Sequence, residues 1–282
     1  MFEDFYFLDE DHVKITAATV GISKKRWKLA TEEDVNTGSY KEVMQRNRFD
    51  HLPIVSNEKR ITEYFKTIKP NDFSRIEKHE IKFNDIIPLD TNIREVIEKF
   101  ASSGRSFYFL SYHKNISGLI TLGNLNCKQV QIYLFSLLCD LERALSDFLN
   151  SELTNQEIQS WIESKINPDD PSNKFALIIS HFNELVNTDL ENQLTEHLFL
   201  VDFFEIIKKF NLNIKLNYSK TKFDELSSIN ELRKKIAHPT RSLLDNDNNI
   251  FKLKERLDKI DDLSFRLNKY KERINAQQLE NV

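Results

Sequence analysis

The stretch of sequence that decides the fold is 85–124, DIIPLDTNIREVIEKFASSGRSFYFLSYHKNISGLITLGN. An apolar run at 85–89 is typical of a short strand, and the apolar residues of 92–103 recur with the spacing of a helix. Two further runs, 106–110 and 116–121, are strand-like. The stretch therefore predicts one compact piece of structure built in the order strand, helix, strand, strand.

The predicted helix has signals at both ends, and the whole pattern has a counterpart earlier in the chain. The side chains of 90–93, Asp-Thr-Asn-Ile, can cap its first turn, and Gly104 can end it in a left-handed conformation. Upstream, a helix-like stretch at 40–47 is followed by strand-like runs at 51–55 and 60–65. Two similar patterns in tandem predict a pseudo-symmetric pair.

The composition suits a folded protein of two domains. The chain has 282 residues, of which 40% are hydrophobic and 30% charged, and this balance argues against long disordered tracts. The formal net charge of -4 means that a nucleic-acid contact would need a local basic patch. No window resembles a signal peptide or a membrane span, so we expect a cytoplasmic protein that does not enter the membrane.

Beyond Asn124 the pattern changes to long helices with few breaks. The apolar stripe of 129–149 is long enough to connect two domains or two subunits, and 167–172, with two prolines and two aspartates, is a predicted turn. The stripe of 250–274 is typical of a buried helix or of a dimer seam. Other helical patterns cover 175–186, 196–210 and 224–238.

The front half resembles a tandem pair of CBS modules over residues 30–130. The residues that carry the resemblance are His51-Leu-Pro-Ile-Val55 and Gly118-Leu-Ile-Thr-Leu-Gly-Asn124. The resemblance implies two modules that pack side by side through their sheets, with clefts between them that bind an adenine nucleotide or a related adenosyl ligand. In that family a Gly-x-x-Thr-x-x-Asp stretch supplies groups to the ribose and phosphate.

Gly118, Thr121 and Asn124 are the ligand-binding residues that this resemblance implies. Gly118 lets the backbone approach a ligand and Thr121 offers a short hydroxyl, but Asn124 stands where the family has a carboxylate. An asparagine accepts hydrogen bonds through one oxygen only, so we expect weaker ribose binding. The first module has Glu63 near the expected glycine, so one cleft at most is equipped. The alternative is a dimerisation platform that binds no ligand.

The most informative stretch of the back half is 230–241, NELRKKIAHPTR, at the end of a helical pattern. Pro239 disfavours the helical conformation at His238, so the helix should end there and the imidazole can turn into a cleft. Arg233 supplies a permanent charge and a planar fork of donors. These groups are suitable for gripping and cleaving a phosphodiester.

The Arg-x-x-x-x-His spacing before a proline, in a helical domain, resembles the HEPN family. The resemblance implies a dimer in which two such motifs face each other and cut RNA without a metal. His238 would act as the acid or base, and Arg233 would hold the scissile phosphate. Lys234, Lys235 and Arg241 would attract the RNA.

Two alternatives to a nuclease remain. Catalytic members usually have Asn, Asp or His after the arginine, where this chain has Lys234, so the first alternative is a non-catalytic dimerising bundle. A solvated helix end, with Arg233 paired to a nearby acidic residue such as Glu231 or Asp224, is the remaining alternative.

The other reactive side chains suggest no further site. We expect Cys127 and Cys139 to be unpaired core residues, and His181 to be a core or interface residue. His197, beside Glu196, is expected in an exposed pair or as a second contributor to the cleft. No spacing of histidines, cysteines or carboxylates predicts a metal site, and no cofactor is required.

The sequence therefore predicts an α/β CBS-pair-like domain over 1–128, a connecting helix over 129–152 and an all-α HEPN-like bundle over 153–282. The leading hypothesis is a homodimeric ribonuclease that is regulated by a nucleotide and acts in a stress or anti-phage response. The alternative is a non-enzymatic nucleotide sensor or dimerising scaffold.

Overall fold

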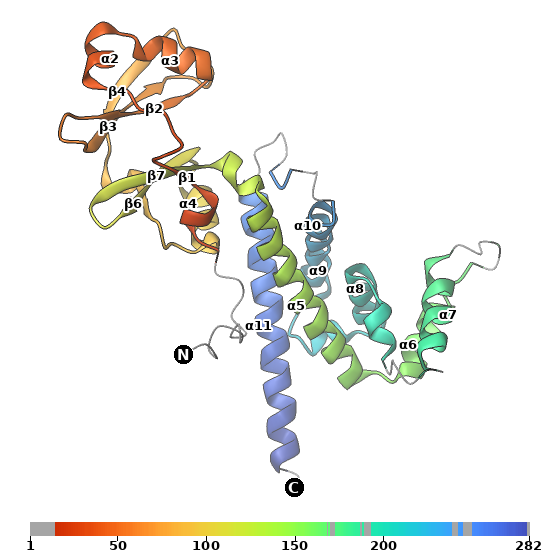
Figure 1. The fold of residues 1–282 in the computed structure, drawn as a ribbon. Coiled ribbons are helices and arrows are strands. Elements are labelled where there is room, and N and C mark those ends of the chain that lie inside the picture. The colour runs from red at the N-terminus through yellow and green to blue at the C-terminus, as the bar shows by residue number, and fades with distance from the viewer. Residues whose placement is uncertain are drawn as a thin grey trace. The chain divides into compact units, whose positions relative to one another are not determined.

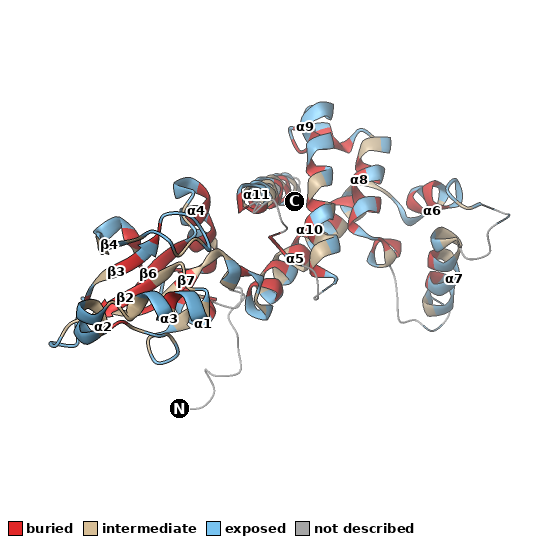
Figure 2. Cartoon of the chain, turned by 90° about the horizontal axis from the view of Figure 1, so that it is seen from above, coloured by how far each residue is buried: buried red, intermediate tan, exposed pale blue. Residues whose placement is uncertain are grey.

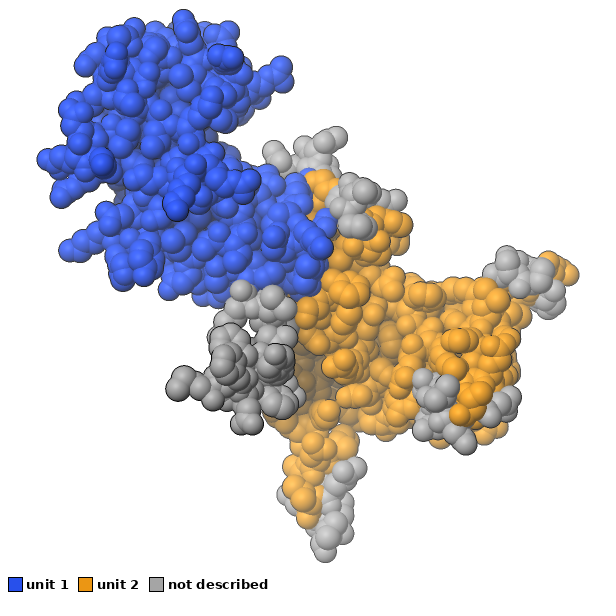
Figure 3. All heavy atoms as spheres, in the orientation of Figure 1, with its two compact units in different colours: residues 1–133, 244–251 blue, residues 134–243, 252–282 orange. Residues whose placement is uncertain are grey.

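The chain divides into two compact units (Figure 3). Unit 1 comprises Met1–Tyr133 and Leu244–Phe251, and unit 2 comprises Leu134–Leu243 and Lys252–Val282. The expected connecting helix is not a separate part, because its first residues belong to unit 1 and the rest to unit 2. The computed structural model describes residues 15–167, 169, 173–186, 188, 193–238, 242–244 and 250–280, apart from the side chains of 278 and 280.

Unit 1 is a mixed α/β structure with two small sheets (Figure 1). One sheet has the strand order β1-β7-β6-β5 and the other has the order β2-β3-β4. Its helices and strands are α1 (Ala17–Val20), β1 (Ile22–Ser23), α2 (Glu32–Thr37), α3 (Tyr40–Asn47), β2 (His51–Val55), β3 (Ile61–Thr67), β4 (Ile76–Glu80), β5 (Ile86–Pro88), α4 (Ile93–Ser103), β6 (Phe107–Tyr112) and β7 (Asn115–Thr121).

The stretch 85–124 folds in the predicted order. Strand β5 pairs parallel with β6 across helix α4, and β6 pairs antiparallel with β7. The Asn92 side chain accepts a hydrogen bond from the Glu95 backbone N–H at the start of α4, and Gly104 ends the helix with φ of 65°. Both predicted caps are therefore confirmed.

The earlier stretch repeats this arrangement in reduced form. Ala30 makes a parallel bridge to Ile54 of β2, helix α3 follows Ala30, and β2 pairs antiparallel with β3. Ala30 thus occupies the place that β5 has in the second module. The tandem pair is confirmed, with the opening strand of the first module shortened to one bridging residue.

The two sheets pack against each other through aromatic side chains. Tyr64 of β3 contacts Phe107 and Phe109 of β6, and all three are buried. Strand β1, which precedes the first module, pairs with β7 of the second and so ties the two modules together. Burying a phenylalanine such as Phe109 contributes about 2 kcal/mol, so this contact is a substantial part of the stability of unit 1.

Unit 2 is entirely helical over its described residues. The apolar stripe of α5 is buried along most of its length (Figure 2), and the apolar stripe of α11 is buried up to Tyr270. The rings of Phe148 and Tyr270 meet edge to face at 4.9 Å, which places α5 beside α11. Its α-helices are α5 (Lys128–Glu152, which begins in unit 1), α6 (Asn155–Glu163), α7 (Lys174–Val186), α8 (Leu200–Lys209), α9 (Lys220–Asp224), α10 (Ser228–Ile236) and α11 (Ile250–Glu280).

Several predicted boundaries in the helical half are wrong. Helix α8 begins at Leu200 rather than at Glu196, because 194–197 form a separate 3-10 turn. The helix predicted from Asp224 to about His238 is divided, because Asp224 ends α9, a 3-10 turn covers 225–227 and α10 covers Ser228–Ile236. Helix α6 has no counterpart among the predicted elements, although Thr154 and Glu157 form a capping box at its start. Most of the predicted turn at 167–172 lies outside the described residues.

Candidate functional site

Unit 1 contains a cavity of about 370 Å³. We call it the unit 1 cavity. Its walls come from both modules, because they include the start of β2, the start of β6 and the end of β7. It is lined by Ile22, Arg26, Trp27, Lys28, Arg48, Phe49, Asp50, His51, Pro53, Ser106, Phe107, Leu119 and Thr121.

Aromatic packing holds the lining in place. The indole of Trp27, in the loop after β1, meets Phe109 edge-on with 6.4 Å between ring centroids. The imidazole of His51, the first residue of β2, lies 3.7 Å from the ring of Phe107, the first residue of β6. Flat, apolar walls of this kind suit a planar heterocycle.

Two enclosed ring nitrogens of the lining have no hydrogen-bond partner within the described part of the chain. They are Nε1 of Trp27 and Nε2 of His51. Burial, followed by the charge of Lys66, lowers the pKa of His51 to about 4, so the imidazole is neutral at physiological pH. A buried polar group without a partner costs about 1–3 kcal/mol, so a ligand that reaches these nitrogens recovers part of this cost.

The polar part of the lining is strongly positive. Arg26, Lys28 and Arg48 are exposed side chains with no acidic partner among the described residues. The single carboxylate, Asp50, accepts hydrogen bonds from the Thr67 hydroxyl and the Asn71 backbone N–H, at 2.8 and 2.7 Å. The lining therefore contains three cations and one carboxylate, and that carboxylate already accepts hydrogen bonds from Thr67 and Asn71.

Of the three residues predicted to bind a ligand, only Thr121 lines the unit 1 cavity. Gly118 lies in β7 opposite Ser23 of β1, and a Cβ atom there would stand 2.6 Å from the Ile22 carbonyl oxygen. The glycine is therefore required by strand pairing.

Asn124 caps the turn that follows β7. Its Oδ1 accepts hydrogen bonds from the backbone N–H and the hydroxyl of Thr121, at 2.8 and 2.9 Å. This acceptor, which the sequence assigned to a ribose, is used within the chain. Part of the Gly-x-x-Thr-x-x-Asn pattern is thus explained by local structure alone.

In unit 2, Arg233 is engaged by side chains of its own unit. Its Nε donates to Glu142 Oε1 of α5 at 2.9 Å, and its guanidinium lies over the ring of Phe199 at 5.4 Å from the ring centroid. The expected acidic partners Glu231 and Asp224 instead pair with Lys234 and Lys208. The structure therefore corrects the identity of the acidic partner of Arg233.

The other residues of the predicted RNA site are dispersed. His238 is exposed in the turn after α10, where its backbone N–H donates to the Lys235 carbonyl at 3.3 Å. Arg233 and Lys234 line a groove of about 580 Å³ with Phe199, and His238 is not in its lining. Lys235 Nζ donates to the Leu243 carbonyl, and Arg241 lies outside the described residues.

The remaining reactive side chains differ from expectation. Cys127 and Cys139 are free but only half-buried, and His181 is exposed, so it is not a core residue, whereas its expected interface role stays a prediction. The ring of His197 lies 5.3 Å from that of His181. Within the described residues, no group of three histidine, cysteine or acidic side chains could hold a metal ion.

The cationic lining was missed in the sequence, although it had a signal. The run Lys24-Lys25-Arg26-Trp27-Lys28 joins four cations to one of the two tryptophans of the chain. A basic run around an aromatic residue is a pattern of sites that bind phosphorylated heterocycles or nucleic acids. Arg48 and His51 could not be added from the sequence, because only folding brings them to Trp27.

Comparisons with known proteins concern the fold. No protein-family model matches the sequence, and no curated protein is significantly similar to it. Solved structures with CBS domains resemble part of the chain. A hemolysin-like protein containing a CBS domain, from Oenococcus oeni PSU, is 13% identical, with a TM-score of 0.29 over 40% of this chain and 88% of that chain.

Two further structures resemble the chain to a similar degree. The CBS domains of a transcriptional regulator from Streptococcus pneumoniae are 16% identical, with a TM-score of 0.31 over 38% of this chain and 92% of that one. A conserved CBS domain protein of unknown function from Thermoplasma acidophilum is 11% identical, with a TM-score of 0.31 over 44% and 76% of the two chains. Values this low assign no ligand or activity. The expected HEPN resemblance of unit 2 stays a prediction.

No helix within the described residues combines the length and the apolar character that crossing a membrane requires.

Proposed function

We propose that unit 1 is a ligand-sensing regulatory module that binds an adenine nucleotide or a related adenosyl ligand in the unit 1 cavity. The observation that carries the proposal is the coincidence, in one cavity, of aromatic walls, two ring nitrogens without partners and a cationic lining. The heterocycle would occupy the space beside Trp27, His51 and Phe107. The ribose would lie near Thr121, as the resemblance to CBS modules implies.

The fit of a purine supports this proposal. A donor-only indole N–H needs a ligand acceptor, and a neutral imidazole nitrogen can pair with a donor or an acceptor. The edge of an adenine ring offers both kinds of group next to each other. A cavity of about 370 Å³ lies within the size range of small-molecule sites.

Binding can be followed through Trp27. In a Trp161→Phe background Trp27 is the single tryptophan, so its fluorescence reports unit 1 alone. We expect adenine nucleotides to change this fluorescence saturably, and His51→Ala to weaken binding by about tenfold, the loss of one buried polar contact. If adenine nucleotides caused no change in fluorescence and no heat of binding in calorimetry, the ligand-sensing proposal would fail. The dimerising scaffold that binds no ligand would then remain.

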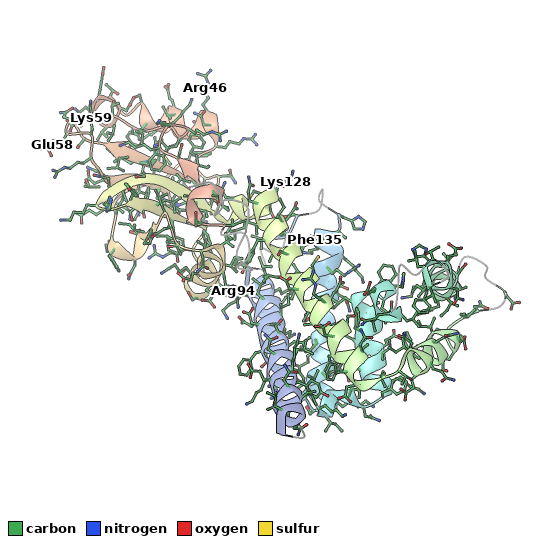
Figure 4. All side chains as sticks on the ribbon, turned by 60° about the horizontal axis from the view of Figure 1, so that its bottom comes forward. Arg46, Glu58, Lys59, Arg94, Lys128 and Phe135 are labelled. Atoms are coloured by element: carbon green, nitrogen blue, oxygen red, sulfur yellow. The ribbon has the colours of Figure 1, made fainter. Side chains whose placement is uncertain are left out.

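Self-association is part of the proposal. Ile132 and Phe135, one turn apart on α5, are exposed apolar side chains, and Phe135 projects from the helix (Figure 4). Adjacent exposed apolar residues on a helix suit contact with a second copy of the chain. Sedimentation of wild type and Phe135→Glu tests this, and a monomeric wild type at micromolar concentration would end the dimer proposal.

A second candidate function is RNA cleavage in unit 2, regulated by the ligand of unit 1. It is favoured by the presence of Arg233, Lys234 and the Phe199 ring in one groove, where a phosphate and a base could be held together. The Glu142 contact opposes it, because a phosphate would have to displace that carboxylate. His238 would have to approach from the helix end or from a second subunit.

RNA incubated with wild type and with His238→Ala, with and without adenine nucleotides, tests this second candidate. His181→Ala is the matched control, since it removes another exposed histidine of unit 2. Cleavage that requires His238 and not His181 would support the nuclease. A wild-type protein that leaves RNA intact under all conditions would exclude it.

A further inference from the structure

Arg48 has an unusual backbone for its residue type. It follows α3 in the left-handed conformation, with φ of 55°, and its backbone N–H donates to the carbonyl groups of Met44 and Gln45. Glycine or asparagine is favoured at such a helix end, since a larger side chain is strained there. Lys59 and His113 also have a positive φ, so the conformation alone indicates no site, but only Arg48 of these three lines the unit 1 cavity.

Arg48 is one of three unpaired cations from two separate segments. Arg26 and Lys28 reach the same lining from the loop between β1 and α2. The one carboxylate of the lining, Asp50, is engaged by Thr67 and Asn71, so the positive charges of the lining favour an anion that binds among them. A ligand with a single negative charge would leave most of this positive charge unbalanced.

We infer that the ligand of the unit 1 cavity carries a di- or triphosphate group, held by Arg26, Lys28 and Arg48, and that these cations select against monophosphates and uncharged or cationic adenosyl compounds. This inference rests on the proposed function and narrows its ligand class. The guanidinium groups of Arg26 and Arg48 can each take two phosphate oxygens, whereas Lys28 adds a point charge. The purine and the polyphosphate thus contact different parts of one lining.

The ligand series of the test is adenosine, AMP, ADP and ATP, titrated without Mg²⁺ into the full-length Trp161→Phe protein. We expect affinity to rise along the series, with ATP at least about tenfold tighter than AMP, because each added charge meets an unpaired cation. The affinity for ATP should also fall more steeply with salt than that for AMP. Inorganic tripolyphosphate should compete with ATP.

Arg48→Glu and Arg46→Glu form a matched pair of variants. Both reverse a positive charge at the end of α3, but Arg46 is exposed, lines no part of the cavity and projects away from the body of unit 1 (Figure 4). We expect Arg48→Glu to reduce ATP affinity at least about tenfold with little effect on adenosine, and Arg46→Glu to change neither. Arg48→Gly should likewise weaken ATP binding without lowering the melting temperature, since glycine suits the left-handed backbone.

The titrations distinguish a failure of the polyphosphate inference from a failure of the proposed function. If adenosine and all nucleotides bind equally well, or if both charge reversals weaken ATP alike, the polyphosphate inference is overturned while ligand sensing stands. If none of the four compounds binds to the wild-type cavity, the adenine-nucleotide part of the proposed function falls and the inference falls with it.

Discussion

The cations of unit 1 and unit 2 differ in what surrounds them. In the unit 1 cavity, Arg48 has a left-handed backbone conformation and, among the residues that the structure describes, no carboxylate partner. In unit 2, Arg233 has a relaxed helical backbone, a carboxylate at 2.9 Å and an aromatic ring beneath it. A basic residue in a motif that suggests catalysis, such as Arg233, can therefore have a structural role, in which it joins two helices through an ion pair. Unpaired charge in a cavity is the better indicator of a ligand site.

The largest expected effect concerns pH and the His51 side of the cavity. The pKa of His51 in the folded chain is lowered from 6.5 to about 4. Between pH 6.5 and 4, His51 is therefore protonated in the unfolded chain but neutral in the folded chain. Stability of unit 1 should therefore fall as pH drops from 6.5 to 4, by up to about 3 kcal/mol. Urea unfolding followed by Trp27 fluorescence measures this.

His51→Gln is the control for this titration. It should flatten the stability of unit 1 across the same range, because no imidazole remains to take up the proton. An unchanged pH dependence in this variant would show that another group titrates.

Gly118→Ala should destabilise unit 1 by about 2 kcal/mol, because the new methyl group would meet the Ile22 carbonyl at 2.6 Å and disturb the pairing of β1 with β7. Ligand affinity at temperatures below unfolding should change less than stability does. Thermal melts and nucleotide titration of the same sample measure both. If the Gly118→Ala variant were as stable as the wild type but no longer bound nucleotide, the ligand-binding role that the sequence predicted for Gly118 would be supported instead.

Asn124→Ala should cost about 1 kcal/mol, since it removes the acceptor of two hydrogen bonds from Thr121. Asn124→Asp should retain the cap, because a carboxylate accepts the same two bonds. Comparing the melting temperatures of the two variants separates capping from ligand binding. Equal losses in both would contradict the capping role.

The smallest effect is expected from Glu142→Gln. The ion pair with Arg233 is partly exposed, so its loss should cost about 0.5 kcal/mol of stability. Burial and then the Glu142 charge raise the pKa of Cys139, so the substitution should lower that pKa and speed alkylation of Cys139 relative to Cys127. Unchanged alkylation rates would contradict a contribution of the Glu142 charge to the pKa of this thiol.

By itself, the sequence determined the local elements of unit 1. The apolar runs of β2 and β6, the spacing of α4 and the caps at Asn92 and Gly104 are set by neighbouring residues, and all are observed. Short-range signals of this kind need no tertiary contact to be read. The buried stripes of α5 and α11 were predicted for the same reason.

Only the tertiary structure decided which groups share a site. Trp27, the segment from Arg48 to His51, and Thr121 are far apart in the sequence, and the packing of two sheets through Tyr64 brings them around one cavity. Likewise, the pairing of Arg233 with Glu142 joins residues 91 positions apart. Charge partners depend on distances across the fold, and residue spacing does not give these distances. The sequence therefore did not show that Arg233 is already paired with Glu142. It also predicted only Thr121 among the residues that line the unit 1 cavity.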